Sequence, residues 1–340
     1  MPQPDRSRRR STSLVVGVAA LLCAALIGAS PVSGTAAAVP TNIGARPVAA
    51  EVTAQSWIRP GREVDLTIDS PALGSEAAVK LLLPRDWSPT ATRTWPVLYL
   101  LHGCCEASGH TVWTRMTDVE QQVEDRDVIV VMPAAGWAGF YSNWRNHGLG
   151  GGPQWEDFHL TELREIVERD FLGGQRRAVA GLSMGGFGAL SYAARHPGMF
   201  QAAASFSGVV HTLMDLRGPL LTSGLVLSGG SAPTAVWGDP LTARRVWAEH
   251  NPYDLADRLT GLPVYISSGN GRPGPLDASF GLIDPLESPI GDMNRRLVER
   301  LRQVGADVTA HLYGAGTHTW PYWQRELELA LPLLLEEIGA

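Results

Sequence analysis

The segment at residues 178–190, AVAGLSMGGFGAL, decides the fold because it joins an apolar run, a tight turn and a helix start. The apolar part predicts a buried strand, and the small residues after it predict a helix at 185–196. Between them, residues 181–185 form a G-x-S-x-G pattern centred on Ser183. The glycines are needed because this strand-to-helix turn is tight and the serine backbone is strained. The segment therefore predicts Ser183 as a nucleophile held above the end of a strand.

Strands and helices alternate along most of the chain. Short apolar runs with β-branched residues predict strands buried on both faces, and helical periodicity appears between them. This alternation predicts an α/β fold with a mostly parallel central sheet, helices on both faces and a single domain at 51–340. The expected strands are 77–84, 95–103, 127–134, 176–183, 201–208, 262–269 and 307–314; the expected helices are 155–171, 185–196, 293–305 and 322–338.

The first 38 residues are typical of a secretory signal peptide. Four arginines lie within residues 6–10, an apolar run covers 14–27, and the small residues at 36–38 offer a cleavage site. A retained membrane anchor is disfavoured because the apolar run is short for a bilayer. We expect a flexible lead-in at 39–50 and a protein that is secreted, in some cases cell-wall associated, with no stable membrane insertion after signal removal.

The charge balance excludes one class of partner. The chain carries 28 basic and 34 acidic residues, a formal charge of −6. Loss of residues 1–38 removes four Arg and one Asp, which leaves 24 basic and 33 acidic residues and a charge of −9. An acidic surface argues against nucleic acid as a partner. The chain has no C-x-x-C pair and no H-E-x-x-H motif, so we expect no metal and no cofactor.

Two adjacent cysteines, Cys104 and Cys105, lie in the segment LHGCCEASG at 101–109. Neighbouring α-carbons lie about 3.8 Å apart, whereas a relaxed disulfide needs roughly 4.4–6.8 Å. A bond between these cysteines is expected to be strained, and we expect the fold to depend on its core instead. The absence of partner ligands also disfavours a metal or redox site.

A serine nucleophile needs a neighbouring base. Several histidines follow Ser183, and in hydrolases with this serine motif the chain order is Ser, acid, His. His318 lies in a glycine-rich loop between the last expected strand and the last expected helix, which is where the fold presents its histidine. His211 and His250 come too early, and His311 lies inside a strand. We therefore predict His318 as the base.

The acid is expected between the strand at 262–269 and His318. Four carboxylates lie between this strand and the expected helix at 293–305, and the residues alone do not choose among them. Each of them would have to fix the imidazole tautomer and stabilise the imidazolium. They are Asp277, Asp284, Glu287 and Asp292.

Several motifs resemble a known family. GLSMGG carries the serine, FYSNW (140–144) resembles an aromatic segment near the active site, SSGNG (267–271) ends the strand before the acid, and THTWPYW (317–323) is similar to the histidine segment. Over residues 66 to 340 the chain resembles the esterase D family of α/β-hydrolases, and within it the secreted mycolyltransferases of the antigen 85 group. The resemblance implies an α/β-hydrolase fold.

The resemblance also implies roles for individual residues. It supports His318 as the base and places the family's acid on Glu287, with Asp284 and Asp277 as alternatives. The oxyanion is then expected to meet two backbone N–H groups, those of Met184 and Cys104, and the sulfur of Cys104 is expected to be incidental. The substrate-binding candidates are His102, Phe140, Tyr141, Trp144 and Trp320.

One departure from the antigen 85 group bears on the substrate. Where those relatives carry Asp-Gly, this chain has His102-Gly103, the form of plain carboxylesterases. We therefore expect a secreted serine carboxylesterase acting on small-molecule or lipid acyl esters. The alternative is an acyltransferase, similar to mycolyltransferases or diacylglycerol acyltransferases, that moves an acyl group to trehalose, glycerol or another polyol. A third possibility is an inactive hydrolase-fold protein used for binding or adhesion.

Overall fold

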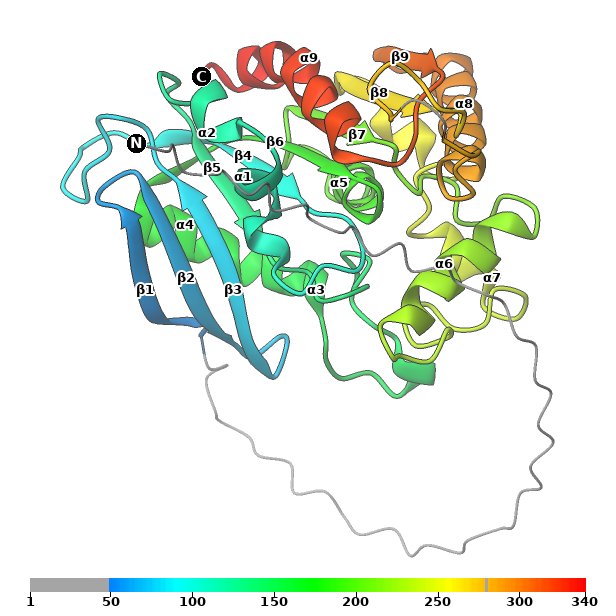
Figure 1. Ribbon diagram of the computed structural model, residues 1–340. Helices are drawn as coiled ribbons and strands as arrows, with labels where there is room; N and C mark the ends of the chain where they lie inside the picture. The colour runs from blue at the N-terminus through cyan, green and yellow to red at the C-terminus, as the bar shows by residue number, and fades with distance from the viewer. Residues whose placement is uncertain (1–48, 279–280) are drawn as a thin grey trace, which may run out of the picture. The chain divides into compact units, whose positions relative to one another are not determined.

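The computed structural model of the chain describes residues 49–278 and 281–340 (Figure 1). The expected signal peptide and most of the expected lead-in lie outside these residues. Within them, strands assemble into one nine-stranded sheet in the order β1-β2-β3-β5-β4-β6-β7-β8-β9. The strands are β1 (Glu51–Arg59), β2 (Glu63–Ser70), β3 (Ser75–Leu82), β4 (Trp95–Leu101), β5 (Ile129–Pro133), β6 (Gly173–Leu182), β7 (Ala202–Phe206), β8 (Val264–Gly269) and β9 (Val308–Gly314).

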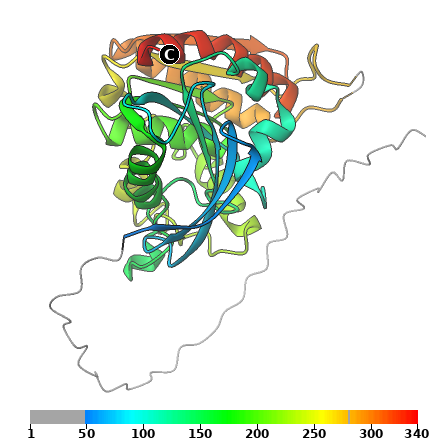
Figure 2. The same ribbon diagram turned by 90° about the vertical axis from the view of Figure 1, so that its left-hand side faces the viewer.

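The sheet has an antiparallel edge and a parallel body. β1, β2 and β3 form an antiparallel meander, and β3 pairs antiparallel with β5. The pairs from β5 through β4, β6, β7 and β8 to β9 are all parallel. The mostly parallel sheet predicted from the sequence is confirmed. In Figure 2 the meander, in blue, faces the viewer.

Two of these strands were absent from the expected series. β1 exposes most of its side chains and therefore shows no period-2 burial pattern, and β2 precedes the first expected strand at 77–84. Gly61 and Gly74 occupy the turns of the meander with φ of 68° and 66°, a backbone conformation that favours glycine. These turns, which the apolar runs do not mark, allow the antiparallel edge to form.

Helices cover both faces of the sheet, as predicted. On β4, Val97, Tyr99 and Leu101 belong to a core shared with α4, α5 and α8. Leu98 and Leu100 belong to the opposite core, shared with α1, α2 and α9. Both sets are buried because a parallel strand with helices on both sides has no solvent face.

The helices differ from expectation mainly at their ends. The expected helix at 155–171 is a succession of α3, a π-helical segment and α4, and α8 begins at Glu287, six residues before the expected start. α6 and α7 lie in a long connection between β7 and β8. The helices are α1 (Val112–Met116), α2 (Val119–Gln122), α3 (Trp155–Asp157), α4 (Arg164–Phe171), α5 (Met184–Arg195), α6 (Arg217–Ser228), α7 (Arg244–Ala248), α8 (Glu287–Gln303) and α9 (Trp320–Ile338).

One expectation about burial is wrong. β9 was expected to be buried on both faces, but its side chains alternate between half-buried and exposed. The reason is its place in the sheet: β9 is an edge strand with β8 as its only strand neighbour. No helix among the described residues is long and apolar enough to cross a membrane.

Candidate active site

Ser183 lies in the turn between β6 and α5, with φ of 53° and ψ of −118°. A non-glycine residue at such an angle is strained, and this strain is typical of a nucleophile elbow. The turn closes only because its flanking residues are small. A Cβ on Gly185 would come within 2.6 Å of the His102 carbonyl oxygen, and a Cβ on Gly181 within 2.9 Å of Leu101 Cβ. The predicted strand-turn-helix context of Ser183 is present.

His318 follows β9 in the loop before α9, and its ring forms a short contact with a carboxylate. Its Nδ1 lies 2.6 Å from Oε2 of Glu287. Since an ionised carboxylate only accepts hydrogen bonds, Nδ1 carries the proton and Nε2 is left as the basic nitrogen. The ring of Trp323 packs edge-on against the imidazole, with centroids 4.9 Å apart.

Glu287, the first residue of α8, is fully buried. Its Oε1 accepts hydrogen bonds from the hydroxyl of Ser207 at 2.8 Å and from the Gly269 N–H at 2.7 Å. These neutral donors stabilise a buried carboxylate without replacing the histidine as its partner. Ser207 was missed in the sequence, where the only signal is a serine at the end of the strand next to β8.

The other three carboxylate candidates do not contact the imidazole. Asp284 accepts from the backbone N–H of His318 at 2.8 Å and from that of Leu286 at 2.8 Å. Asp277 bonds to Thr317 and to the hydroxyl of Tyr322. Asp292 pairs with arginines on the surface. Asp284 and Asp277 therefore hold the histidine loop, and only Glu287 holds the ring.

A pocket of about 310 Å³ brings Ser183 and His318 together. Its walls are mostly apolar and come from segments far apart in the sequence. Trp320, a predicted substrate-binding residue, lies in this wall. The lining residues are Gly103, Cys104, Cys105, Glu106, Leu182, Ser183, Leu225, Leu286, His318, Thr319, Trp320 and Trp323.

Two backbone N–H groups beside Ser183 have no acceptor among the described residues. They belong to Met184, at the start of α5, and to Cys104, in the loop after β4. The loop lies close to the elbow, because a Cβ on Gly103 would meet Ser183 Cβ at 3.3 Å. Free N–H groups beside a nucleophile are the chemistry of an oxyanion hole.

The two cysteines of this loop are joined. A disulfide links Cys104 to Cys105, whose α-carbons lie 3.8 Å apart. The sequence predicts only that such a bond would be strained, and the bond is present: the loop places the two sulfurs together at the pocket wall, with Cys105 at φ of 74°.

Four of the predicted substrate-binding residues lie elsewhere. Phe140 and Tyr141 are fully buried in the core, and Trp144 lines a different, smaller hollow of about 150 Å³. The His102 ring is also buried, with Nδ1 2.6 Å from the Gly103 oxygen and Nε2 accepting from the Ala135 N–H at 2.9 Å. Burial lowers the pKa of His102 to about 4. None of these four side chains lines the pocket that contains Ser183.

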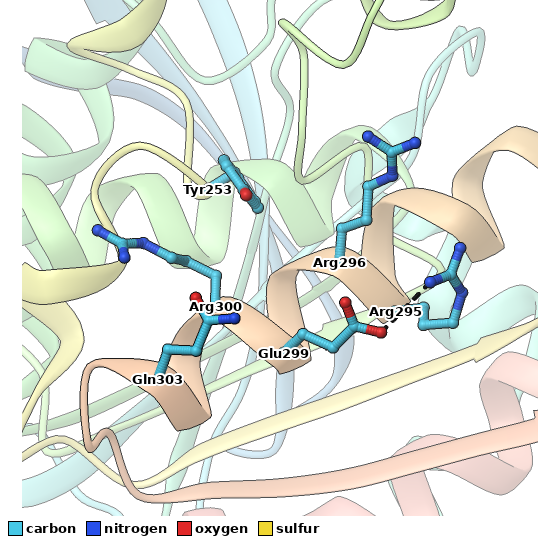
Figure 3. A pocket seen from close by; sticks show the side chains of 6 residues that line it. All are labelled: Tyr253, Arg295, Arg296, Glu299, Arg300 and Gln303. Atoms are coloured by element: carbon cyan, nitrogen blue, oxygen red, sulfur yellow. Dashed lines mark hydrogen bonds and ion pairs between the residues drawn. The ribbon is translucent and has the colours of Figure 1, made fainter.

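Two further hollows differ in chemistry from this pocket. One, of about 270 Å³, shares Glu106 with it and extends to Trp137. The other, of about 360 Å³, lies on α8, where arginines surround Tyr253 (Figure 3). In Figure 3 Arg295 is paired with Glu299, at 3.2 Å. Neither a serine nor a histidine is among the residues that line the α8 hollow.

Among residues 49–278 and 281–340, no group of three or more His, Cys, Asp and Glu side chains is arranged to hold a metal ion.

Comparison with known proteins finds similarity to esterases and to an acyltransferase. Residues 70–334 match the family described as "Putative esterase". Esterase Rv1288 of Mycobacterium tuberculosis (strain ATCC 25618 / H37Rv) is 34% identical over 252 residues, which are 71% of this chain and 52% of that protein. The chain thus spans about half the length of that relative. The diacylglycerol acyltransferase/mycolyltransferase Ag85B of Mycolicibacterium smegmatis is 29% identical over 97% of this chain and 96% of its own.

Solved structures agree on the architecture. Mycobacterium tuberculosis MPT51 (FbpC1) superposes with a TM-score of 0.65 and 24% identity over 80% of this chain and 97% of its own. At this identity the likeness shows the fold, and the α/β-hydrolase fold predicted from the sequence is confirmed.

Proposed function

The chain belongs to the esterase family matched by residues 70–334, and on that premise we propose that it is a serine carboxylesterase with Ser183, His318 and Glu287 as its triad. One observation carries the proposal. A strained elbow serine shares a pocket with a histidine whose Nδ1 lies 2.6 Å from a buried glutamate. This arrangement is the one needed to activate a hydroxyl as a nucleophile.

The first half of the reaction forms an acyl-enzyme. Ser183 Oγ attacks the ester carbonyl carbon while His318 Nε2 takes the hydroxyl proton. Glu287 keeps the imidazole in the correct tautomer and stabilises the imidazolium that forms. The carbonyl oxygen becomes an oxyanion, which accepts hydrogen bonds from the N–H groups of Cys104 and Met184. Each such donor typically contributes about 3 kcal/mol.

Loss of the alcohol completes the acyl-enzyme, and the second half of the reaction then releases the acid. The C–O bond to the alcohol breaks as His318 returns its proton to the leaving oxygen. Water then enters, loses a proton to His318 and attacks the acyl carbon, and Ser183 leaves with that proton. The apolar wall formed by Leu225, Leu286 and Trp320 suits the acyl portion of the substrate.

The cellular setting belongs to the same proposal. The signal-like sequence at 1–38 supports export, and it leaves residues 51–340 as the catalytic domain. The proposed substrate is a small-molecule or lipid acyl ester, with no cofactor required by this mechanism.

A hydrolysis assay tests the proposal. Wild type and Ser183→Ala are compared on p-nitrophenyl butyrate, with Ser191→Ala as the matched control because Ser191 is a buried serine on α5, the helix that follows Ser183. We expect the control to keep its activity and Ser183→Ala to lose about 10⁶-fold in kcat, the scale seen when a triad serine is removed. Activity surviving in Ser183→Ala would refute the nucleophile.

One observation favours acyl transfer as the second candidate. The hollow of about 270 Å³ that shares Glu106 with the catalytic pocket offers room for an acceptor alcohol beside the acyl-enzyme. The relative Ag85B carries an acyltransferase name. Adding trehalose or glycerol to the assay and quantifying acylated product distinguishes the two. Transfer that far outruns hydrolysis at millimolar acceptor would replace the esterase proposal.

A further inference from the structure

The disulfide between Cys104 and Cys105 lies at the point where the proposed reaction develops negative charge. Both cysteines line the pocket with Ser183, and the Cys104 N–H is one of the two proposed oxyanion donors. The hydrolysis mechanism itself makes no use of the sulfurs. Their position therefore calls for a separate explanation.

The backbone of Cys105 adopts a conformation that needs support. Its φ of 74° lies in the left-handed region, which is unfavourable for an L-residue other than glycine. A second link, a hydrogen bond of 2.7 Å from the Cys105 N–H to the Trp137 carbonyl, holds the same residue. The bridge and this hydrogen bond together fix the loop from both sides.

A bond between neighbouring cysteines also acts on the residue before. It closes a small ring that contains the Cys104–Cys105 peptide, so the torsions on both sides of that peptide lose their freedom. The Cys104 N–H adjoins this ring. On its other side lies Gly103, which is packed closely against Leu182 and Ser183.

We propose that the Cys104–Cys105 bridge is a positioning device for the Cys104 N–H, and that activity depends on its oxidation state. This inference rests on the proposed esterase function. A dithiol reductant supplies two electrons and two protons: the S–S bond breaks, two cysteine thiols form, and the reductant closes into its own disulfide. In the reduced form Cys105 is free to return to a negative φ, and the oxyanion donor loses its fixed place.

The esterase activity is therefore expected to depend on the redox conditions of the compartment that holds the protein. Reducing cytosol keeps thiols open and oxidising extracellular surroundings close them. A chain of this kind hydrolyses esters slowly before export and rapidly after it. The oxidation state of the two sulfurs then determines when the oxyanion hole is complete, although the sequence analysis expects the Cys104 sulfur to be incidental.

The test measures kcat and KM for p-nitrophenyl butyrate on the full chain before and after treatment with dithiothreitol. Thiol titration confirms that the bridge has opened. We expect kcat to fall about 10²-fold, the lower end of the effect of losing one oxyanion donor, and KM to change less than about threefold. Reoxidation with oxidised glutathione restores kcat.

The matched control is the double variant Cys104→Ala/Cys105→Ala. It keeps Cys23, so any effect of the reductant through that residue persists in the control. We expect the double variant to have the low kcat of the reduced protein and no response to dithiothreitol. An unchanged kcat in reduced wild type, with both thiols titrated, overturns the proposal.

A readout independent of activity separates this proposal from the esterase function. Hydrogen–deuterium exchange is followed in peptides that cover 101–109 and 181–190. Reduction is expected to raise exchange in 101–109 and leave 181–190 unchanged. Equal exchange in both redox states contradicts the positioning role, whereas an oxidised protein that hydrolyses no ester contradicts the proposed function instead.

Discussion

Among the described histidine–glutamate pairs, two join the ring Nδ1 to a fully buried glutamate, and their geometries are close to equal. His318 Nδ1 lies 2.6 Å from Glu287 Oε2, and His311 Nδ1 lies 2.9 Å from Glu326 Oε2. Both glutamates are fully buried, Glu287 on α8 and Glu326 on α9. By distance and burial alone, either pair could be interpreted as a catalytic histidine base held in orientation by a glutamate.

The surroundings separate the two pairs. Glu326 also contacts the guanidinium of Arg325 and accepts from the hydroxyl of Tyr265 at 2.8 Å. Burial and the Glu326 carboxylate both raise the pKa of Tyr265. The His311 side chain is 41% exposed on the edge strand β9, whereas His318 lines a pocket with Ser183. The comparison teaches that a His–Glu contact marks a base only when the other ring nitrogen shares a cavity with a nucleophile.

The largest expected difference comes from the same substitution at both pairs. Glu287→Gln is expected to lower kcat on p-nitrophenyl butyrate about 10⁴-fold, because the amide favours the wrong imidazole tautomer. Glu326→Gln serves as the matched control and is expected to change kcat less than about threefold. A Glu287→Gln variant with activity near wild type, or equal losses in both, would remove the distinction between the pairs.

Histidines without a carboxylate partner extend the comparison to stability. Burial is the main cause that lowers the pKa of His159 to about 3 and of His102 to about 4. Below the unfolded value of about 6.5 the unfolded chain binds protons that the folded chain does not, so stability is complete above pH 6.5 and falls as the pH decreases toward 4. His159 alone is expected to cost about 2 kcal/mol at pH 5.

Urea unfolding at pH 7 and pH 5 measures this slope. His159→Gln is expected to lose less stability between the two values than wild type, whatever its stability at pH 7. His147→Gln, at an exposed loop position, is the control and should retain the wild-type slope. Parallel slopes in all three proteins would contradict the account of the buried imidazoles.

The structural role of the second pair gives the next prediction. Glu326→Gln removes a buried charge that Arg325, Tyr265 and His311 share, so we expect a loss of about 2 kcal/mol in the free energy of unfolding. Glu299→Gln, which removes an exposed and salt-bridged glutamate on α8, is expected to cost less than about 0.5 kcal/mol. Urea titration of the two variants decides the point, and equal stability would mean that the buried pair contributes nothing beyond a surface contact.

The smallest expected effect is a decrease in kcat on substitution of Asp284. The carboxylate of Asp284 accepts hydrogen bonds from the backbone N–H groups of both His318 and Glu287. One oxygen accepts from the His318 N–H and the other from the N–H groups of Leu286 and Glu287. Asp284→Asn replaces one acceptor by a donor, so we expect about a tenfold loss in kcat with a change in KM of less than about twofold. Asp292→Asn, on the surface of α8, should leave kcat unchanged. An unchanged kcat in Asp284→Asn would show that the histidine loop keeps its place without this carboxylate.

The sequence predicts the parallel body of the sheet because its strands are short apolar runs between amphipathic helices. It does not predict β1, whose exposed side chains carry no burial pattern. Ser183 and His318 are predictable from a local motif and from chain order. Glu287 is chosen over Asp284 only by family resemblance, because its partners Ser207 and Gly269 reach it from other strands.

Two aromatic residues that the sequence analysis assigns to substrate binding lie in the core instead. Phe140 and Tyr141 lie in a segment that resembles one near the active site, yet both are core residues, and Tyr141 serves by donating a hydrogen bond to the His102 carbonyl at 2.9 Å. An apolar side chain fills a core or a substrate pocket equally well, so its type does not reveal which. The Cys104–Cys105 bond is also not predicted from the sequence. The spacing of adjacent α-carbons indicates that such a bond would be strained, and the loop conformation that brings the two sulfurs together is not apparent from the residue types.

Trapping the acyl-enzyme tests the central claim most directly. Wild type is mixed with p-nitrophenyl butyrate, quenched in acid before the steady state ends, digested and examined by mass spectrometry. If Ser183 is the nucleophile, we expect a butyryl group on the peptide that contains Ser183 and none on that peptide in Ser183→Ala. A butyryl group on another residue, or steady turnover by Ser183→Ala, would contradict it.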